Sequence, residues 1–217
     1  MTSATTPDRY RPHVAQRSSD DSAAAILDAA RELLSSEGQG ALTVRRIAAA
    51  AGGSTMNVYS RFGGKDGVID ALLIEGFEKL TEVIVAAYSR ASATDDLMTC
   101  ALAYREFALA YRTHYELMFD RAIRGYQMSD AAVAAAMASL GSLASRIQYE
   151  MDKGNIRQGD AMETATIFWA ACHGPVSLEL RMAGKSIADW TEVHRRLAEA
   201  VIAGLRPDAR RAAANKR

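Results

Sequence analysis

Four basic side chains, Arg45, Arg46, Arg61 and Lys65, lie between residues 39 and 65, and no acidic residue interrupts them. The whole chain, by contrast, balances 26 Lys and Arg against 26 Asp and Glu. A local excess of positive charge attracts phosphate groups, and phosphate neutralisation supplies much of the affinity of proteins for nucleic acids. This stretch therefore predicts a surface that binds a phosphate backbone.

The residues between these cations are suited to contacts with base edges in a major groove. An Asn such as Asn57 pairs with adenine, an Arg such as Arg61 pairs with guanine, and Thr55 or Met56 can touch a thymine methyl. We expect the base-facing side chains to be Thr55, Met56, Asn57, Ser60 and Arg61. We expect phosphate contacts from Thr43, Arg45, Tyr59 and Lys65, with Ser54 capping the reading helix.

Two short helices joined by Gly52 and Gly53 would position these side chains. Thr43 and Ser54 are N-cap residues by type, because their hydroxyls can accept a hydrogen bond from a free backbone N–H in the first helical turn. Such an arrangement is typical of a helix-turn-helix, in which the second helix enters the major groove. On periodicity and charge alone, a solvated helical hairpin with ordinary surface arginines remains an alternative.

A family pattern runs through the same region. An alanine- and leucine-rich first helix and a Gly-rich turn lead into TVRRIAAAAGGS, which continues to VYSRFGGKD. The stretch from Ile26 to Leu73 resembles the DNA-binding domain of TetR-type transcriptional regulators. The matching positions are Thr43, Ile47, Ala48, Ala51, Gly52, Ser54, Val58, Tyr59, Phe62, Gly64, Lys65 and Asp66. Gly53 and Val68 depart from the commonest residues of that pattern.

Length and composition predict an all-α protein. Its 217 residues allow one or two domains, and alanine and leucine dominate while strand formers are sparse. The resemblance implies an N-terminal three-helix helix-turn-helix domain followed by a C-terminal helical ligand-binding and dimerisation bundle, about nine helices in total. We divide the chain into a disordered tail (1–19), a DNA-binding domain (20–66), a ligand-binding and dimerisation domain (67–205) and a disordered basic tail (206–217).

One helix should connect the two predicted domains. Apolar residues keep helical spacing from Gly64 to about Arg90, so a single helix would begin beside the DNA and end in the second domain. We expect this helix to transmit a ligand-induced shift to the DNA-binding residues.

The segment from Thr164 to Leu178 is apolar on nearly every side, and the run FWAACHGPVSLEL begins within it. Trp169, His173 and Gly174 resemble the W-x-x-x-H-G pattern of one branch of TetR-like C-terminal domains, and the i, i+4 spacing puts Trp169 and His173 on one helical face. We interpret His173 as a core or pocket histidine bonded to a neighbour, because no other His or Cys has metal-ligand spacing to it.

A ligand cavity needs apolar walls with a few polar groups. Our candidate lining residues, each of which ordinary core packing would also explain, are Tyr104, Phe107, Tyr111, Met137, Trp169 and His173. The last helix, expected from Ser186 to Leu205, carries Trp190, Val193, Leu197, Ala200, Val201 and Gly204 on one face. Two such helices and their symmetry mates would form a four-helix interface, so we expect a homodimer through the last two helices.

Several classes of function have no support in the sequence. We find no nucleophile elbow, phosphate loop, dinucleotide fingerprint or zinc-protease motif, so we expect no catalytic residues, no metal and no cofactor. Cys100 and Cys172 lie in apolar runs and are expected to be small buried hydrophobes. The first residues lack the apolar stretch of a signal peptide, and no uncharged run is long enough to cross a membrane, which favours a cytoplasmic location.

The sequence therefore predicts a ligand-responsive, DNA-binding transcriptional regulator. By resemblance, it is a repressor that binds an inverted repeat of double-stranded DNA as a homodimer and is released by an unknown small-molecule effector. Two alternatives are a helical small-molecule-binding protein without DNA function and an all-helical enzyme.

Overall fold

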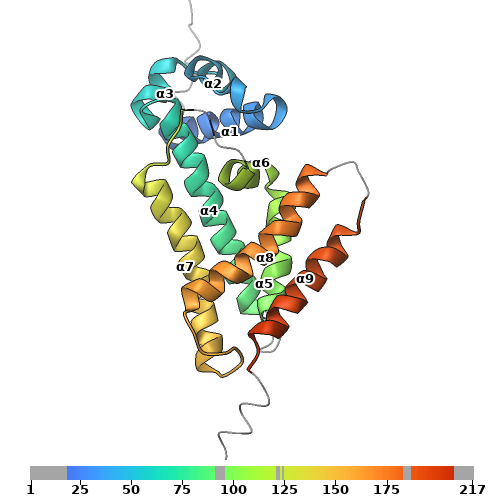
Figure 1. Cartoon of the computed structure of the whole chain (residues 1–217). Helices are drawn as coiled ribbons and strands as arrows, with labels where there is room; N and C mark the ends of the chain where they lie inside the picture. Colours follow the sequence, from blue (N-terminus) through green and yellow to red (C-terminus); the bar gives the residue numbers. More distant parts are fainter. Residues whose placement is uncertain (1–18, 91–95, 121–122, 124, 183–186, 208–217) are drawn as a thin grey trace, which may run out of the picture.

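The computed structural model of the protein describes residues 19–90, 96–120, 123, 125–182 and 187–207. These residues contain helices and connecting segments and no strand, which confirms the predicted all-α fold (Figure 1). The helices are α1 (Ser19–Glu37), α2 (Val44–Ala50), α3 (Thr55–Phe62), α4 (Lys65–Arg90), α5 (Asp96–Ala110), α6 (Arg112–Tyr115), α7 (Asp130–Asp152), α8 (Ala161–Arg181) and α9 (Trp190–Leu205), with a 3-10 turn η1 (Gln39–Ala41) and a π-helical turn η2 (Glu116–Asp120). The tails predicted to be disordered lie outside the described residues, except for residue 19 and residues 206–207.

Helices α1, α2 and α3 form a head at one end of the molecule. Both predicted caps are present: the Thr43 hydroxyl accepts a hydrogen bond from the Arg46 backbone N–H (3.3 Å), and the Ser54 hydroxyl accepts one from the Asn57 backbone N–H (3.4 Å). Helix α3 ends at Phe62 and is capped by Gly63, whose φ of 72° is a left-handed conformation that glycine adopts without a Cβ clash. These local features give α3 its short length and fixed ends.

The head has its own apolar core. Val58 and Ile47 are fully buried, and Ala30 of α1 and Val68 of α4 pack with them. Ala132 of α7 joins this core, so the start of a body helix also supports the head. The predicted division between residues 66 and 67 falls within the first turn of α4 and stays a prediction.

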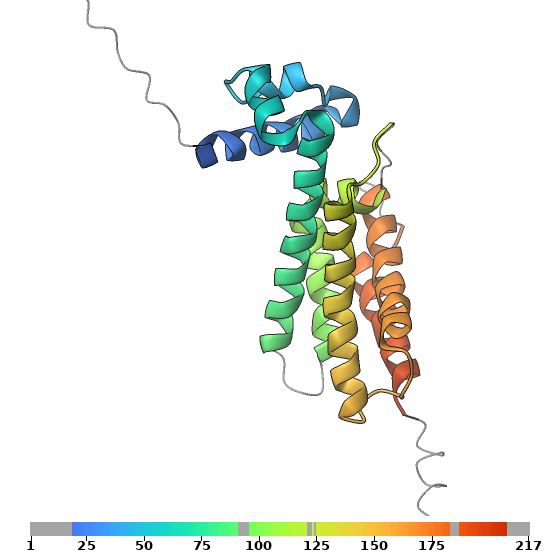
Figure 2. The same ribbon diagram turned by 90° about the vertical axis from the view of Figure 1, so that its left-hand side faces the viewer.

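The remaining helices form a bundle below the head. Figure 2 shows α4 running from the head down the length of this body, beside α7 and α5. The body core holds large side chains such as Tyr115, Phe107 and Ile147, all at most 1 % exposed. Helix α8 crosses the bundle next to α9 (Figure 1).

The last helix begins later than expected. The expected start, Ser186, lies outside the described residues. Ile187, Ala188 and Asp189 are not helical, and α9 begins at Trp190. The reason is local, because the Asp189 side chain caps the helix by accepting the Glu192 backbone N–H (3.1 Å).

Candidate DNA interface and ligand cavity

The outward face of α3 carries the side chains predicted to contact base edges. Thr55, Met56, Asn57, Ser60 and Arg61 are all exposed, and Met56 is 70 % exposed. The one fully buried side chain of α3 is Val58, which anchors the helix in the head core. The helix therefore turns its polar side outward, as contact with a groove requires.

The predicted phosphate contacts lie on α3 itself, at Tyr59, and on the segments to either side of it. Thr43, Arg45 and Tyr59 are exposed, and Lys65, at the start of α4, is half-buried. The Tyr59 ring lies over Gly64, where an added Cβ would be 3.5 Å from the ring. The ring therefore lies close to the turn that leads into α4.

The positive charge of one of the four basic side chains is paired with an acidic residue that lies outside residues 39–65. Arg46 forms an ion pair with Glu37 at the end of α1, and the hydrogen bond from Arg46 lowers the pKa of the Glu37 carboxyl. Lys65 has only a longer contact, 3.8 Å, with the exposed carboxylate of Asp66. The stretch from residue 39 to residue 65 does not reveal this ion pair, because Glu37 lies before it, at the end of α1.

An apolar cavity of about 240 Å³ lies in the body, between α4, α5, α7 and α8. Its lining residues come from these helices and η2: Leu80, Ile84, Cys100, Tyr104, Phe119, Ala136, Met137, Ser139, Leu140, Leu143, Phe168, Trp169 and Cys172. The small side chains of Ala136 and Ser139 leave the space on the α7 side. Met137 is 53 % exposed, so the cavity reaches the surface beside it.

Only half of the predicted lining residues face this cavity. Tyr104, Met137 and Trp169 line it, whereas Phe107, Tyr111 and His173 do not. Phe107 and Tyr111 instead line a separate, more open hollow against Glu82, Val83 and Ala86 of α4. Tyr111 is 40 % exposed there, and the Lys79 ammonium lies 5.7 Å from its ring centre. The pattern of aromatics on one helix could not separate the two sides of α5.

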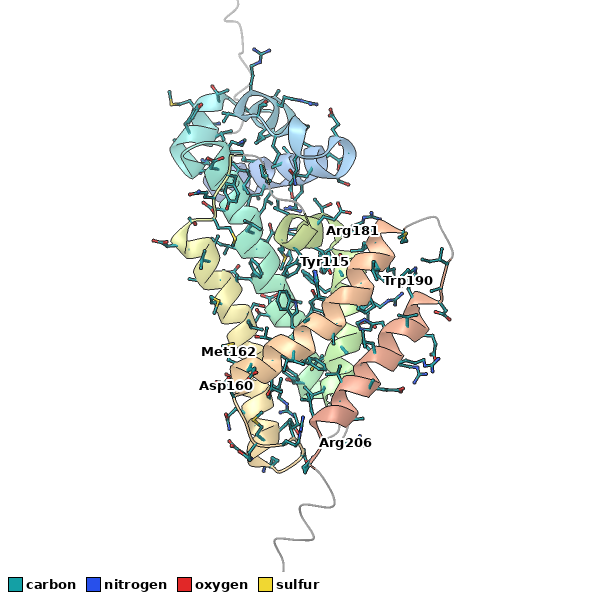
Figure 3. All side chains as sticks on the ribbon, viewed as in Figure 1. Tyr115, Asp160, Met162, Arg181, Trp190 and Arg206 are labelled. Atoms are coloured by element: carbon teal, nitrogen blue, oxygen red, sulfur yellow. The ribbon has the colours of Figure 1, made fainter. Side chains whose placement is uncertain are left out.

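A cluster of hydrogen-bonded side chains extends from the cavity wall into the core. The hydroxyls of Tyr104 and Tyr115 lie 3.1 Å and 2.9 Å from Nδ1 of His173, and Nε1–H of Trp169 donates to the Tyr104 oxygen (3.2 Å). Tyr115 is the last residue of α6, lies beside α8 (Figure 3) and is fully buried. His173 is thus bonded to neighbouring side chains, as the sequence predicted, and it reaches the cavity through Tyr104.

Both cysteines line the cavity as free thiols. Burial raises the pKa of Cys100 and of Cys172 to about 12, so both stay protonated. Sequence reasoning identified them as small buried hydrophobes but did not place them at a site. It also missed Phe119, because nothing in the local pattern signals the π-helical turn that carries it.

Helix α4 touches both regions. Leu80 and Ile84 line the cavity, while the first turn of the same helix packs against α3. Midway along α4, Glu75 lies 3.8 Å from the Arg31 guanidinium of α1 and 3.6 Å from Nε2 of His114 of α6. A carboxylate on α4 therefore joins the head to the segment that leads into η2.

An unpartnered apolar face runs along α8 and α9. Ile167 and Leu178 of α8 and Val193 and Leu197 of α9 are between 37 and 51 % exposed. Figure 3 shows the two helices side by side, with Met162 and Arg181 near the ends of α8 and Trp190 and Arg206 near those of α9. The inward face of α9 is a different one, formed by His194, Ala198 and Leu205.

Metal-binding side chains do not gather within the described ranges, where no cluster of three or more His, Cys, Asp or Glu side chains could hold a metal ion. In the same part of the chain, no helix combines the length and apolarity needed to cross a membrane.

Comparison with known families matches both halves of the chain. A family model described as Tetracyclin repressor-like, C-terminal domain, matches residues 97–205, and one described as Bacterial regulatory proteins, tetR family, matches residues 26–72. The chain belongs to the TetR family. It is therefore a ligand-responsive, DNA-binding transcriptional regulator, a class of proteins that are generally not enzymes. The likeness of residues 169–174 to one branch of TetR-like domains stays a prediction.

Solved structures share the fold of this TetR-family regulator. A protein with unknown function from Rhodococcus sp. RHA1 is 25 % identical with a TM-score of 0.77, covering 91 % of this chain and 100 % of that one. PfmR, a TetR family transcriptional regulator from Thermus thermophilus, is 18 % identical (TM-score 0.63; 84 % and 99 % covered). SmeT in a complex with triclosan is 18 % identical (TM-score 0.64; 87 % and 93 % covered). No curated protein matches the chain.

Proposed function

We propose that this regulator is a cytoplasmic homodimeric repressor that binds an inverted-repeat operator and leaves it when a small molecule occupies the body cavity. Residues 20–66 would bind DNA, and residues 67–205 would bind the effector and the second subunit. The observation that carries this proposal is the position of α4, which supports the exposed α3 at one end and lines the cavity farther along.

The DNA-binding side chains are assigned by their exposure and chemistry. Asn57 and Arg61 are exposed on α3: an Asn amide can both donate to and accept from an adenine edge, and an Arg guanidinium can donate to a guanine edge. Arg45 and Lys65 provide cations for flanking phosphates. Two heads related by a two-fold axis would read two half-sites on one side of the duplex.

Dimerisation is assigned to α8 and α9. Contiguous exposed apolar residues on two neighbouring helices are typical of subunit interfaces. A two-fold pairing of this face would bury Ile167, Leu178 and Leu197, which the monomer leaves about half exposed.

Ligand control is assigned to the cavity. The fold neighbour SmeT was solved with triclosan, and the cavity of this chain has the apolar walls that such ligands require. An effector can release DNA only to the extent that it prefers the conformation in which the two heads no longer match successive grooves.

The test is binding to the DNA upstream of the protein's own coding region, followed by sequence selection from random duplexes. We expect a protected inverted repeat and, with three or four phosphate contacts per subunit, a slope of log K against log salt of roughly −5 to −7. A slope near zero, or selection of no symmetric site, would overturn the proposal. The alternative, a helical ligand-binding protein without DNA function, predicts that outcome.

A further inference from the structure

The wall of the body cavity carries no charge. Among the described residues that line it there is no Asp, Glu, Lys, Arg or His, and the polar atoms are confined to Tyr104, Trp169, Ser139 and two protonated thiols. A charged ligand would lose its hydration here with no opposite charge to replace it, at a cost of several kcal/mol. The part of an occupant that lies against this wall is therefore expected to be uncharged.

The volume limits the size of the occupant. The cavity measures about 240 Å³, below the roughly 300–1,000 Å³ of sites for drug-sized ligands. It has room for on the order of ten non-hydrogen atoms.

Tyr104 is the polar group best placed to bind such a ligand. It is 4 % exposed, it lines the cavity, and its oxygen already accepts a hydrogen bond from Trp169. The Tyr104 hydroxyl can therefore bind a ligand as a hydrogen-bond donor. Burial raises the pKa of Tyr104 well above its ordinary value, so the hydroxyl proton is retained at neutral pH.

Tyr104 can turn its hydroxyl away from His173 because His173 has a second partner. An imidazole nitrogen makes one in-plane hydrogen bond at a time, yet two tyrosine hydroxyls lie within 3.1 Å of Nδ1 of His173. Tyr115 lies behind the wall, whereas Tyr104 faces the cavity. Tyr115 can hold His173 while Tyr104 turns its proton toward a ligand.

We infer that the cavity binds a small, uncharged, largely hydrocarbon molecule with one hydrogen-bond acceptor. This acceptor takes a hydrogen bond from the Tyr104 hydroxyl, while Tyr115 keeps the hydrogen bond to His173. This inference names the ligand class of the proposed effector site and rests on that proposal only for its effect on DNA binding.

The experiment uses four probes of equal non-hydrogen atom count on the full-length protein. Acetophenone is neutral with an acceptor, isopropylbenzene lacks the acceptor, benzoate is an anion and 1-phenylethylammonium is a cation. Binding is followed by the intrinsic fluorescence of Trp169 and Trp190 together and by calorimetry. We expect acetophenone to bind about tenfold more tightly than isopropylbenzene, as one net hydrogen bond allows, and the two ions to bind more weakly than either.

Three tyrosine variants locate the source of this preference. Tyr104→Phe should bring the acetophenone to isopropylbenzene ratio close to one without weakening isopropylbenzene. Tyr115→Phe should lower the ratio less, because Tyr104 then has to leave His173 without a replacement. Tyr88→Phe is the matched control, since Tyr88 packs against the same core but does not line the cavity; its ratio should be unchanged. Thermal unfolding of each variant confirms that it is folded.

The outcomes separate two claims, the ligand class of the cavity and the proposed effector role of the cavity in DNA binding. A ratio unchanged by Tyr104→Phe, or an ion that binds as tightly as acetophenone, overturns the ligand class. The same is true if no probe binds while the protein still protects its operator. A preference that depends on Tyr104 supports the ligand class, and if acetophenone then leaves operator affinity unchanged, it is the proposed effector role of the cavity that fails.

Discussion

Gly67 lies against the backbone of Phe62: a Cβ built on Gly67 would be 1.7 Å from the Phe62 carbonyl oxygen. Backbone atoms cannot give way as a flexible side chain can, so any larger residue at position 67 must push α4 away from the end of α3. The orientation of the reading helix on α4 therefore depends on this glycine.

Gly67→Ala should reduce operator affinity strongly and lower the free energy of unfolding by about 1–3 kcal/mol, the usual cost of overpacking. Gly141→Ala in α7 is a matched control, because a Cβ there meets nothing within 4 Å; it should stabilise the helix by about 0.5–1 kcal/mol. Gel shifts and thermal unfolding measure both effects. Operator affinity equal to that of wild type in Gly67→Ala would show that α3 tolerates the displacement.

Lys65→Ala should weaken binding to all DNA sequences alike. Losing one phosphate contact in each subunit of a dimer makes the slope of log K against log salt less steep by about 1.8. Gel shifts on the operator and on unrelated DNA at several salt concentrations measure this. Arg195→Ala, on α9 far from the head, is the control and should leave the slope unchanged. Loss confined to the operator would assign Lys65 to base reading.

Arg61→Ala should relax base preference at one position of each half-site. A bidentate Arg–guanine contact contributes about 1–3 kcal/mol of discrimination. Sequence selection before and after the substitution measures the change. If preference is retained and only the salt slope falls, Arg61 contacts phosphate instead.

Leu197→Glu should convert the dimer into a monomer that remains folded. Leu197 is 38 % exposed in the subunit, so a carboxylate there is harmless until the second copy covers it. Light scattering after size exclusion gives the mass, and circular dichroism gives the fold. Val85→Glu on α4 is the control, as Val85 is 46 % exposed away from α8 and α9; if it dissociates the dimer instead, the interface lies elsewhere.

Stability should fall as the pH is lowered through about 6.5, the pKa of an unperturbed histidine. Burial lowers the pKa of His194 and of His114 in the folded protein, although Glu75 opposes this at His114 and the bond to the Ala101 carbonyl opposes it at His194. The unfolded chain then binds more protons below pH 6.5, which favours unfolding by up to about 1.4 kcal/mol per pH unit for each histidine.

The measurement is thermal unfolding between about pH 7.5 and pH 5.5. His194→Gln cannot titrate, but it retains a donor for the Ala101 carbonyl, so its melting temperature should depend less on pH than that of wild type. Glu163→Gln, which removes an exposed carboxylate, is the control and should keep the pH dependence of the wild type. An identical pH dependence in His194→Gln would mean that another group titrates.

The head could be predicted almost completely from the sequence because local chemistry decides it. Thr43 and Ser54 cap their helices through backbone groups three residues away, and the apolar Val58 and Phe62 of α3 pack on the head core. Sequence spacing alone is enough to place such features.

The cavity was predicted less well because its walls come from helices far apart in the chain. Tyr104 and Phe107 lie on the same helix, yet one faces the cavity and the other packs in the core. Phe119 enters from a π-helical turn. Similarly, sequence spacing identifies an apolar stripe on α9, but only the packing of His194 and Ala198 on an adjacent face shows that Val193 and Leu197 stay exposed in the subunit. Val201, which the predicted stripe also contained, packs against the body core.

The chain contains two cysteines, and both belong to the wall of the same cavity. A thiol-specific reagent can therefore modify the folded protein only where an effector would sit. Because both thiols have a pKa of about 12, unassisted labelling should be slow. The labelling rate of the unmodified protein consequently reports how often the cavity is open and empty. Compounds that fill the cavity should slow labelling, which gives a screen that needs neither DNA nor an attached dye.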